Sequence, residues 1–567
     1  MFEYYLYYPN YKLRDYEADL AQKEVVAITG EIPEQIDGGL RIINQTSFHT
    51  DALQRLTFFH RIEIRNGSLQ WSGLTYQALL ENTAKIARKV ENSDQVSKVL
   101  NQITLPMNGR KESQHVTHGI HNYKGKFYPQ LVKSLLNYLG AQEGDVILDP
   151  FMGSGTTIVE SYLANMIGVG VDLNPLAHLI SKGKMSCLSL SPEAMIEESG
   201  GLLQRINEAS SRVIGETPQD GLWAEPSQVT PASMQDDGLM NLCRETAPLP
   251  YSAEELKYLF SWFSPLILLK LFLVLGEIER VADERLKILF RVLLSDIIRD
   301  CSQQDPHDLR IRRRRISLRN APVFELFRER VLETSKQLVA FLSTSKTCGV
   351  HGMDWECHYG DTRNLGVLPS RYLALDNSVD LSVTSPPYAT ALPYLDTDRL
   401  SLAFLRLADP HQRRRLEDEM IGNREIVPGV RRKLEQNFLD HYDENPLPME
   451  VKECIRNIYE SNAAADVGFR RKNMGALLYK YFDDMRRSMA EVQKVLKPEA
   501  RFALIVGNNV TKAGDKQVEI LTDRYLGLIG ESLGMRLIEE LHITVTTEDL
   551  AHVKNAIKNN TLLILEK

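Results

Sequence analysis

Residues 144–172 constrain the fold of this chain more than any other segment. They read GDVILDPFMGSGTTIVESYLANMIGVGVD: an apolar run ending in Asp149, a glycine-rich turn, a helical stretch and a second apolar run ending in Asp172. Two apolar strands joined through a helix form a βαβ unit, which requires a parallel sheet covered by helices. Similar apolar runs return at 357–365, 379–388 and 501–509. The chain is therefore predicted to belong to the α/β class.

The rest of the sequence divides around this sheet, because 567 residues exceed one ordinary core. A small N-terminal α+β domain is expected at 1–110, where Asn66-Gly67 between two alternating runs is typical of a hairpin. The sheet is assigned to three segments, 117–190, 346–400 and 476–567. Mainly helical sequence separates them, which predicts a large insertion at 191–345 and a charged insertion at 401–475. The polar segment 107–118, MNGRKESQHVTH, is interpreted as a linker.

One apolar run, Leu259–Gly276, has nearly the length of a membrane span. It contains Pro265, Lys270 and two serines, and charged helical sequence surrounds it. We interpret it as a pair of buried helices. No membrane contact is expected, and the predicted location is the cytoplasm of a prokaryote.

A zinc site is the one metal site that the sequence raises. The six cysteines are dispersed, and Cys348, His351, Cys357 and His358 are the closest approach to a ligand set. Cys357 and His358 are adjacent, and adjacent side chains of a strand point to opposite faces of the sheet. We favour the interpretation that these residues lie at the beginning of a strand, and no metal is expected.

The charge of the chain is mildly acidic, with 75 Asp and Glu against 67 Lys and Arg, a net charge of −8. Binding to nucleic acid would therefore need a local basic patch. The best candidate is the sequence RIRRRRISLR, which has no acidic residue within it and is predicted to contact phosphates. Its arginines are Arg310, Arg312, Arg313, Arg314, Arg315 and Arg319.

The glycine turn after Asp149 is suited to a nucleoside. Glycines at the carboxyl end of a strand let a ligand approach the backbone closely. The turn lacks the lysine of a phosphate-binding Walker loop and the G-x-G-x-x-G spacing that serves dinucleotides. Asp172 ends the next strand, where a carboxylate can accept hydrogen bonds from both hydroxyls of a ribose. A nucleoside without a pyrophosphate fits, and S-adenosylmethionine is the obvious one.

A second motif, Thr384-Ser385-Pro386-Pro387-Tyr388, follows the apolar strand VDLSV. The two prolines fix the backbone and remove two N–H donors, so the carbonyl groups there are available as acceptors. Ser385 adds a side-chain oxygen, and Tyr388 adds a flat surface for stacking. These features suit the exocyclic amine of an aromatic base.

The two motifs together resemble those of the DNA amino-methyltransferases, which use S-adenosylmethionine to modify cytosine-N4 or adenine-N6. Asp149–Gly155 resembles their cofactor motif, and Thr384–Tyr388 resembles their catalytic motif. The segment 121–132, HNYKGKFYPQLV, resembles the segment that closes over the methionine end of the cofactor. Asp361 resembles the acid that reads the adenine amine of the cofactor. The resemblance covers most of 117–190 and 350–567, and implies a Rossmann-like class I methyltransferase sheet.

The resemblance also assigns roles to individual residues. Catalysis is expected of Ser385, Pro386, Pro387 and Tyr388. Binding of S-adenosyl-L-methionine is expected of Tyr123, Lys126, Phe127, Asp149, Phe151, Gly153, Gly155, Thr156, Asp172, Asp361 and Thr384. The helical insertion at 191–345 lies between the two motifs, as the target-recognition region does in one class of the family.

The predicted function is methylation of a base in DNA, with cytosine-N4 favoured because Ser385 precedes Pro-Pro-Tyr. The expected context is a restriction–modification or defence system. DNA is the expected partner, and a second protein of such a system is a further candidate partner. Adenine-N6 in DNA and guanine-N2 in tRNA stay open as alternatives, as does a non-catalytic subunit that binds the cofactor and recognises DNA. A carbon-5 cytosine enzyme is disfavoured, because its cysteine nucleophile typically follows proline and this chain has no Pro-Cys.

Overall fold

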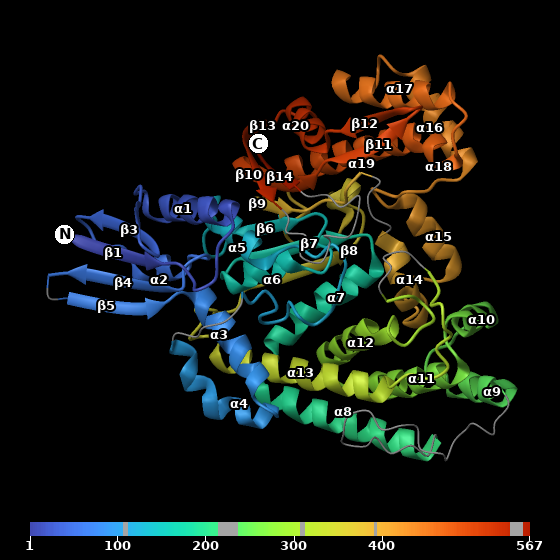
Figure 1. Cartoon of the computed structure of the whole chain (residues 1–567), viewed down its shortest axis with the longest axis horizontal. Helices are drawn as coiled ribbons and strands as arrows, with labels where there is room; N and C mark the ends of the chain where they lie inside the picture. Colours follow the sequence, from blue (N-terminus) through green and yellow to red (C-terminus); the bar gives the residue numbers. More distant parts are fainter. Residues whose placement is uncertain (68, 106–110, 214–235, 307–311, 390–393, 545–558) are drawn as a thin grey trace.

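Seven described strands form the central sheet of the computed structural model, in the order β13-β14-β10-β9-β6-β7-β8 (Figure 1). They are β6 (Val146–Asp149), β7 (Ile167–Asp172), β8 (Trp355–Tyr359), β9 (Val379–Thr384), β10 (Leu496–Gly507), β13 (Arg536–Thr544) and β14 (Asn559–Glu566). The structure describes all residues except 68, 106–110, 214–235, 307–311, 390–393 and 545–558.

The sheet changes direction of winding beside β6. Strands β6, β7 and β8 follow one another toward one edge, whereas β9 and β10 lie on the other side of β6. These five strands are parallel to one another. Strand β14 runs antiparallel to both β10 and β13. The predicted α/β class and the Rossmann-like methyltransferase sheet are confirmed by this topology. Ligands of such sheets bind at the carboxyl ends of the strands, where the winding reverses, which here is between β6 and β9.

Helices cover both faces of the sheet. Successive residues of a strand point to opposite faces, and the buried strands carry apolar side chains on both. On one face, Ile147 and Ile505 pack with α5 (Pro129–Tyr138). On the other, Leu148 and Leu504 pack with α19 (Met474–Val495) and α20 (Thr522–Ser532). Two further helices follow the strands of the first βαβ unit, α6 (Thr156–Leu163) and α7 (Pro175–Ser186).

The N-terminal part contains a separate antiparallel sheet in the order β2-β3-β1-β4-β5. Its strands are β1 (Phe2–Tyr7), β2 (Glu34–Ile36), β3 (Gly39–Asn44), β4 (Arg61–Asn66) and β5 (Leu69–Leu74). Asn66 pairs with Leu69, so the hairpin predicted at Asn66-Gly67 is confirmed. Helix α1 (Asp15–Thr29) lies between this sheet and α5, and its buried Leu20 and Val25 share a core with Leu131 and Leu135 of α5. The helices α2 (Thr50–Gln54), α3 (Tyr76–Lys89) and α4 (Ser93–Val99) complete this part.

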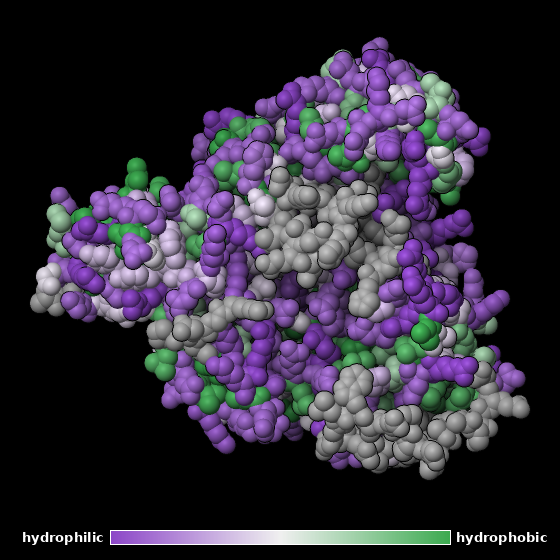
Figure 2. Space-filling view, in the orientation of Figure 1, coloured by the Kyte–Doolittle hydropathy of each residue, from purple (hydrophilic) through white to green (hydrophobic). Residues whose placement is uncertain are grey.

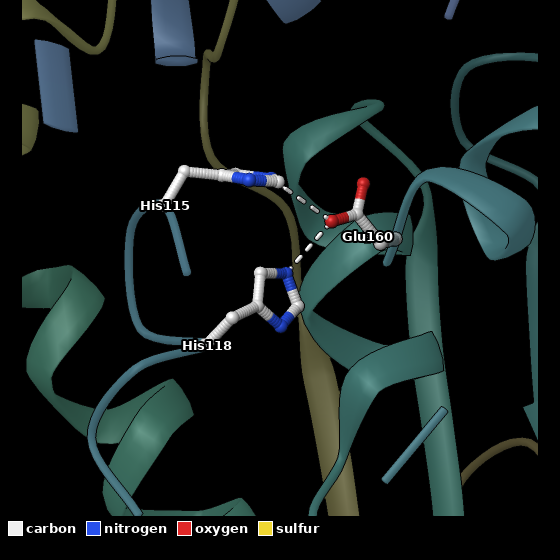
Figure 3. A group of neighbouring side chains, drawn as sticks. All are labelled: His115, His118 and Glu160. Atoms are coloured by element: carbon white, nitrogen blue, oxygen red, sulfur yellow. Dashed lines mark hydrogen bonds and ion pairs between the residues drawn. The ribbon is translucent and has the colours of Figure 1, made fainter. Parts of the chain in front are cut away.

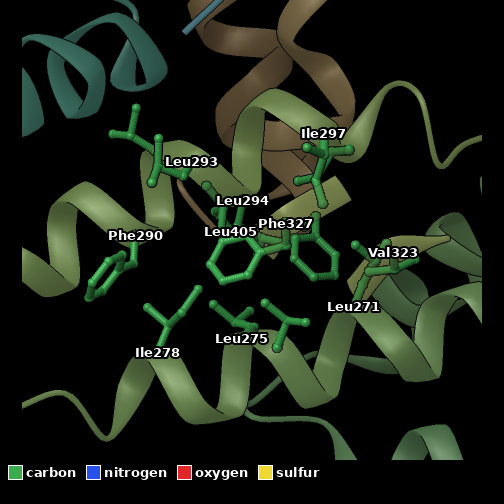
Figure 4. Packing of buried hydrophobic residues seen from close by; sticks show 14 of the residues in the cluster. Leu271, Leu275, Ile278, Phe290, Leu293, Leu294, Ile297, Val323, Phe327 and Leu405 are labelled. Atoms are coloured by element: carbon green, nitrogen blue, oxygen red, sulfur yellow. The ribbon is translucent and has the colours of Figure 1, made fainter. Parts of the chain in front are cut away.

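A helical lobe follows the first half of the sheet. It comprises α8 (Pro192–Val213), α9 (Asp236–Thr246), α10 (Ala253–Trp262), α11 (Pro265–Glu279), α12 (Glu284–Ile298) and α13 (Val323–Thr344). Figure 4 shows how Leu271 and Leu275 of α11 meet Leu294 of α12 and Phe327 of α13, all of which are fully buried. The same apolar core includes Leu176 and Ile180 of α7, so the helical lobe is packed against a helix of the central sheet.

The apolar run Leu259–Gly276 is divided between α10 and α11, which are bent by 117° at their junction. Most of its residues lie in the core of the helical lobe, as the predicted buried helix pair requires. Among the described residues, no single helix is both long and apolar enough to cross a membrane. The face of the molecule seen in Figure 2 is mainly hydrophilic, with its hydrophobic residues scattered in small groups.

A second group of helices separates β9 from β10. It contains α14 (Tyr394–Phe404), α15 (Pro410–Glu419), α16 (Pro428–Asp440), α17 (Met449–Ala463) and α18 (Phe469–Lys472). A small hairpin of β11 (Asn509–Ala513) and β12 (Lys516–Ile520) follows β10.

The linker expected at 107–118 is wrong for its described part. Glu112, His115, Thr117 and His118 are each at most 5% exposed. Their polar side chains are placed inside the protein by tertiary contacts, such as the ion pair of Glu112 with Arg88. Local composition alone could not reveal these contacts.

Candidate functional site

A cavity of about 680 Å³ opens at the carboxyl ends of the central strands. Its walls include Asp172 at the end of β7, Asp361 after β8, Ser385 after β9 and Ile505 in β10. The segment from Tyr123 to Tyr128, which precedes α5, lies along the same cavity. The cavity therefore lies where the winding of the sheet reverses, the place at which such sheets bind ligands.

The glycine turn after β6 has two residues with left-handed backbones, Gly153 with φ +49° and Gly155 with φ +75°. A Cβ atom on Gly155 would lie 2.8 Å from Ser181 Oγ, so this glycine allows close packing on α7. A Cβ on Gly153 would lie 3.5 Å from Tyr123 Cε1, in the space between the turn and the segment before α5. Gly153 lines the cavity, whereas Gly155 does not.

Asp172 presents a carboxylate to the cavity. Its Oδ2 accepts a hydrogen bond from the Gly153 N–H at 2.9 Å, and its Oδ1 accepts one from the Asn174 N–H at 2.8 Å. Burial raises the pKa of Asp172 to about 6, although these N–H groups act against the rise. The carboxylate is thus oriented by the turn and keeps lone pairs that can accept hydroxyl groups.

Asp149 links the two motifs from behind the cavity. Its Oδ1 accepts a hydrogen bond of 2.6 Å from Thr384 Oγ1, and its Oδ2 accepts one of 2.6 Å from Thr157 Oγ1. Burial raises the pKa of Asp149 to about 6. Four residues expected to bind the cofactor do not line the cavity: Asp149, Gly155, Thr156 and Thr384. Their contacts place them in the frame that holds the lining residues.

The four residues expected to act in catalysis all line the cavity. Ser385 Oγ donates a hydrogen bond of 3.2 Å to the carbonyl of Ile505 in the neighbouring strand. Burial raises the pKa of Tyr388 to about 12, so its ring is neutral near pH 7. A half-buried neutral ring beside two prolines offers a surface on which a base can stack.

Asp361 lines the cavity beside Gly360, but its carboxylate also forms an ion pair with Arg363. Arg363 Nη2 lies 2.6 Å from Asp361 Oδ2, and Arg363 Nη1 lies 2.6 Å from Asp484 Oδ1 on α19. Arg363 therefore fixes the position of the acid that is expected to read the adenine amine.

The remaining expected cofactor residues, Tyr123, Lys126, Phe127 and Phe151, also line the cavity. Lys126 Nζ donates a hydrogen bond to the carbonyl of His118, and burial lowers its pKa to about 8. A lysine with this pKa still carries its charge at pH 7 in most molecules.

Two polar residues that the sequence analysis missed support the site. Asn174 Nδ2 donates a hydrogen bond of 2.7 Å to Asp398 Oδ2 on α14, and lies 3.3 Å from Tyr123 Oη. Burial raises the pKa of Asp398 to about 7. Asn174 was detectable, because Asn-Pro two residues after a strand-end aspartate is typical of a helix N-cap. Asp398 carries no local signal.

Another buried cluster lies outside the cavity, where His115 and His118 reach the same carboxylate of Glu160 on α6 (Figure 3). His118 Nε2 lies 2.7 Å from Glu160 Oε1, and His115 Nε2 lies 3.3 Å from it. The shorter distance is that of a hydrogen bond, since two ligands of one tetrahedral zinc ion stand roughly 3.3 Å apart. The cluster thus ties the segment before the cavity to α6.

The arginine run lies in the helical lobe and does not line the cavity in its described part. Arg313 donates to the carbonyl of Ser261, and Arg314 donates to the carbonyls of Asp300 and Ser302. Arg312, Arg313, Arg315 and Arg319 are exposed, Arg314 is half-buried, and Arg310 lies outside the described residues. Phosphate contact remains a prediction, and it concerns mainly the exposed members.

Comparison with known proteins shows which families and proteins this chain is similar to. A family model described as a DNA methylase, for N6 and N4 methyltransferases, matches residues 41–182. The Type II methyltransferase M.MvaI of Kocuria varians is 21% identical over 76% of this chain and 83% of its own length. M.BsoBI of Geobacillus stearothermophilus is 23% identical over 74% and 79%, and M.MjaII of Methanocaldococcus jannaschii is 26% identical over 35% and 42%.

One solved structure, TrmN from Thermus thermophilus, aligns with 100% of this chain and 99% of its own. The identity is 11% and the TM-score is 0.29. The family model and the sequence relatives confirm the resemblance to the N4/N6 amino-methyltransferases. They imply S-adenosylmethionine as the methyl donor.

Proposed function

We propose that this relative of the N4/N6 amino-methyltransferases transfers a methyl group from S-adenosylmethionine to the exocyclic amine of a base in DNA, most specifically to cytosine-N4. One observation carries the proposal. The carboxylate of Asp172 and the Ser385–Tyr388 motif line a single cavity at the reversal of the sheet. The named relatives are Type II methyltransferases, which supports a restriction–modification context.

The residues of the cavity fit the cofactor. Asp172 would accept the ribose hydroxyls, and the absence of a side chain at Gly153 leaves room between the turn and Tyr123. Asp361 would accept the adenine amine through lone pairs that Arg363 leaves available. When bound, S-adenosylmethionine supplies a methyl group on a sulfonium sulfur, and a nucleophile that attacks the methyl carbon displaces the sulfur.

The Ser385–Tyr388 motif would act on the base. Stacking on Tyr388 holds the ring, and Ser385 Oγ and the Pro386 carbonyl accept hydrogen bonds from the amine. These acceptors increase the electron density on the amine nitrogen, which attacks the methyl carbon directly. The new C–N bond replaces the C–S bond, whose electron pair remains on the departing sulfide, and the nitrogen then releases one proton to water. The reacting base must leave the duplex to reach the cavity.

Ser385 is the reason for preferring cytosine over adenine.

The test of the proposed function uses two parallel reactions of the purified protein with methyl-labelled S-adenosylmethionine. One reaction contains duplex DNA and the other contains total tRNA. Digestion to nucleosides and mass spectrometry then identify the labelled base. We expect N4-methylcytosine from DNA; N6-methyladenine would correct the base, and label confined to guanine of tRNA would overturn the DNA assignment.

A further inference from the structure

The segment 119–128, here called the closing segment, includes cavity-lining residues and is held by the helical lobe. Asn122, directly before Tyr123, donates its backbone N–H to Asp296 Oδ1 on α12 at 2.7 Å. Next to it, His121 Nε2 lies 3.1 Å from Ser295 Oγ, also on α12. The last turn of α12 therefore contacts two successive residues of the segment that leads into the cavity.

The same aspartate forms an ion pair with an arginine of α13. Arg330 Nε lies 3.0 Å from Asp296 Oδ2, and the two side chains are 20% and 4% exposed. Arg330 Nη2 also donates to the carbonyls of Gly119 and Ile120, each at 2.9 Å. One ion pair thus holds two carbonyls and one N–H of a four-residue stretch, with charge-assisted hydrogen bonds that are stronger than neutral ones.

The stretch held in this way determines where two cavity residues lie. Tyr123 follows Asn122 directly, and its ring stands 3.5 Å from the position of a Cβ at Gly153. Lys126 is bound to the carbonyl of His118, whose ring is in turn anchored on Glu160 of α6. A shift of residues 119–122 would therefore move Tyr123 away from the glycine turn.

We propose that Asp296 and Arg330 are positioning residues for the cofactor, through which the helical lobe holds the closing segment over the glycine turn. The identity of the cofactor rests on the proposed function, but the clamp itself does not. Neither Asp296 nor Arg330 lines the cavity. Their effect on the cofactor would be transmitted through Asn122 and Tyr123.

The test compares Asp296→Asn with a matched control, Glu279→Gln. Glu279 also forms an ion pair with α12, at 2.7 Å from Arg291 Nε, and the two side chains are 26% and 22% exposed. The control also removes one partner of an ion pair with arginine, at a more exposed position away from the closing segment. Arg330→Lys is a second variant, which keeps the charge but loses the planar guanidinium group that reaches Asp296 through Nε and both carbonyls through Nη2.

Two readouts distinguish positioning from stability. The first is the Kd of S-adenosylmethionine by calorimetry, which Asp296→Asn should raise at least about tenfold. The second is the rate of trypsin cleavage after the exposed Lys124, which should rise by a similar factor without any ligand. Glu279→Gln should leave both unchanged.

Wild-type Kd and wild-type cleavage at Lys124 in both Asp296→Asn and Arg330→Lys would overturn the clamp. If the two variants are cleaved faster at Lys124 but the wild-type protein itself binds no S-adenosylmethionine, the clamp is supported and the proposed function is rejected. A lower melting temperature with unchanged Kd and cleavage would show a purely structural ion pair, and would also overturn the proposal.

Discussion

Thr384 Oγ1 donates a hydrogen bond of 2.6 Å to Oδ1 of Asp149, and this bond joins the strand before the glycine turn to the strand before Ser385-Pro-Pro-Tyr. Both residues are at most 2% exposed. The two motifs are separated by more than two hundred residues in sequence, yet the parallel pairing of β6 with β9 brings them together, and this buried hydrogen bond joins them at the ends of the two strands. Thr384 and Asp149 thus frame the cavity.

Thr384→Val should destabilise the protein, because valine has nearly the same shape but cannot donate to the buried carboxylate. The expected loss is about 1–3 kcal/mol in the free energy of unfolding. Urea denaturation of Thr384→Val beside Thr384→Ser, which keeps the hydroxyl, measures it. Wild-type stability of Thr384→Val would show that the bond contributes nothing.

Asp172→Ala should weaken S-adenosylmethionine binding by removing two charge-assisted hydrogen bonds, each contributing roughly 1.5–3 kcal/mol at most. Gly153→Val should weaken it further, because its side chain would enter the space beside Tyr123. Calorimetric titration measures both affinities. Wild-type affinity in both variants would remove the assignment of this site to the cofactor.

Asp398 gives a pH-dependent contribution to stability. Burial raises its folded-state pKa to about 7, while Asp172 and Arg299 are the charged groups that act on it. A carboxyl whose pKa is higher in the folded than in the unfolded state contributes its full stabilisation below the unfolded pKa of about 3.9. This contribution is lost as the pH rises through the folded-state pKa of about 7. Relative to Asp398→Asn, the wild type should therefore lose stability between about pH 5 and about pH 8. An equal stability difference between the two proteins at both pH values, measured by urea denaturation, would contradict the buried, raised carboxyl.

Arg315→Ala with Arg319→Ala should reduce DNA affinity across sequences and flatten its dependence on salt. The slope of log K against log salt should fall by about 0.9 for each phosphate that the protein no longer neutralises. These two arginines are exposed, whereas Arg313 and Arg314 bind backbone carbonyls. Arg536→Ala, at an exposed arginine of the edge strand β13, is the control. An unchanged slope in the double variant would reject phosphate binding by these arginines.

The sequence allowed the main lines of the site to be predicted, because each motif follows an apolar strand. The carboxyl ends of parallel strands meet at one edge, so Asp172 and Ser385 could be expected to lie in one cavity. The roles within the motifs were less accessible. Thr384 and Asp149 are adjacent to lining residues in sequence, yet their side chains point to each other, and only the register of β6 and β9 determines this.

Contacts between distant segments were beyond prediction from the sequence. Asp296 and Arg330 lie on amphipathic helices, where a charged residue is normally interpreted as part of an exposed face. The polar composition of 107–118 indicated a linker for the same reason. Both cases depend on tertiary partners, such as Asn122 for Asp296, that no local pattern identifies.

The measurement that tests the central claim most directly is methyl transfer to DNA by Ser385→Ala, Tyr388→Ala and the double variant. Loss of the Tyr388 ring should cost about 1–3 kcal/mol of base stacking. Loss of the Ser385 acceptor should cost a further tenfold to thousandfold, roughly, in rate. All three variants are expected to fold, to bind S-adenosylmethionine with wild-type affinity and to lose methyl transfer, with no covalent adduct to DNA. Near-normal turnover of the double variant would contradict the amine-methyltransferase mechanism.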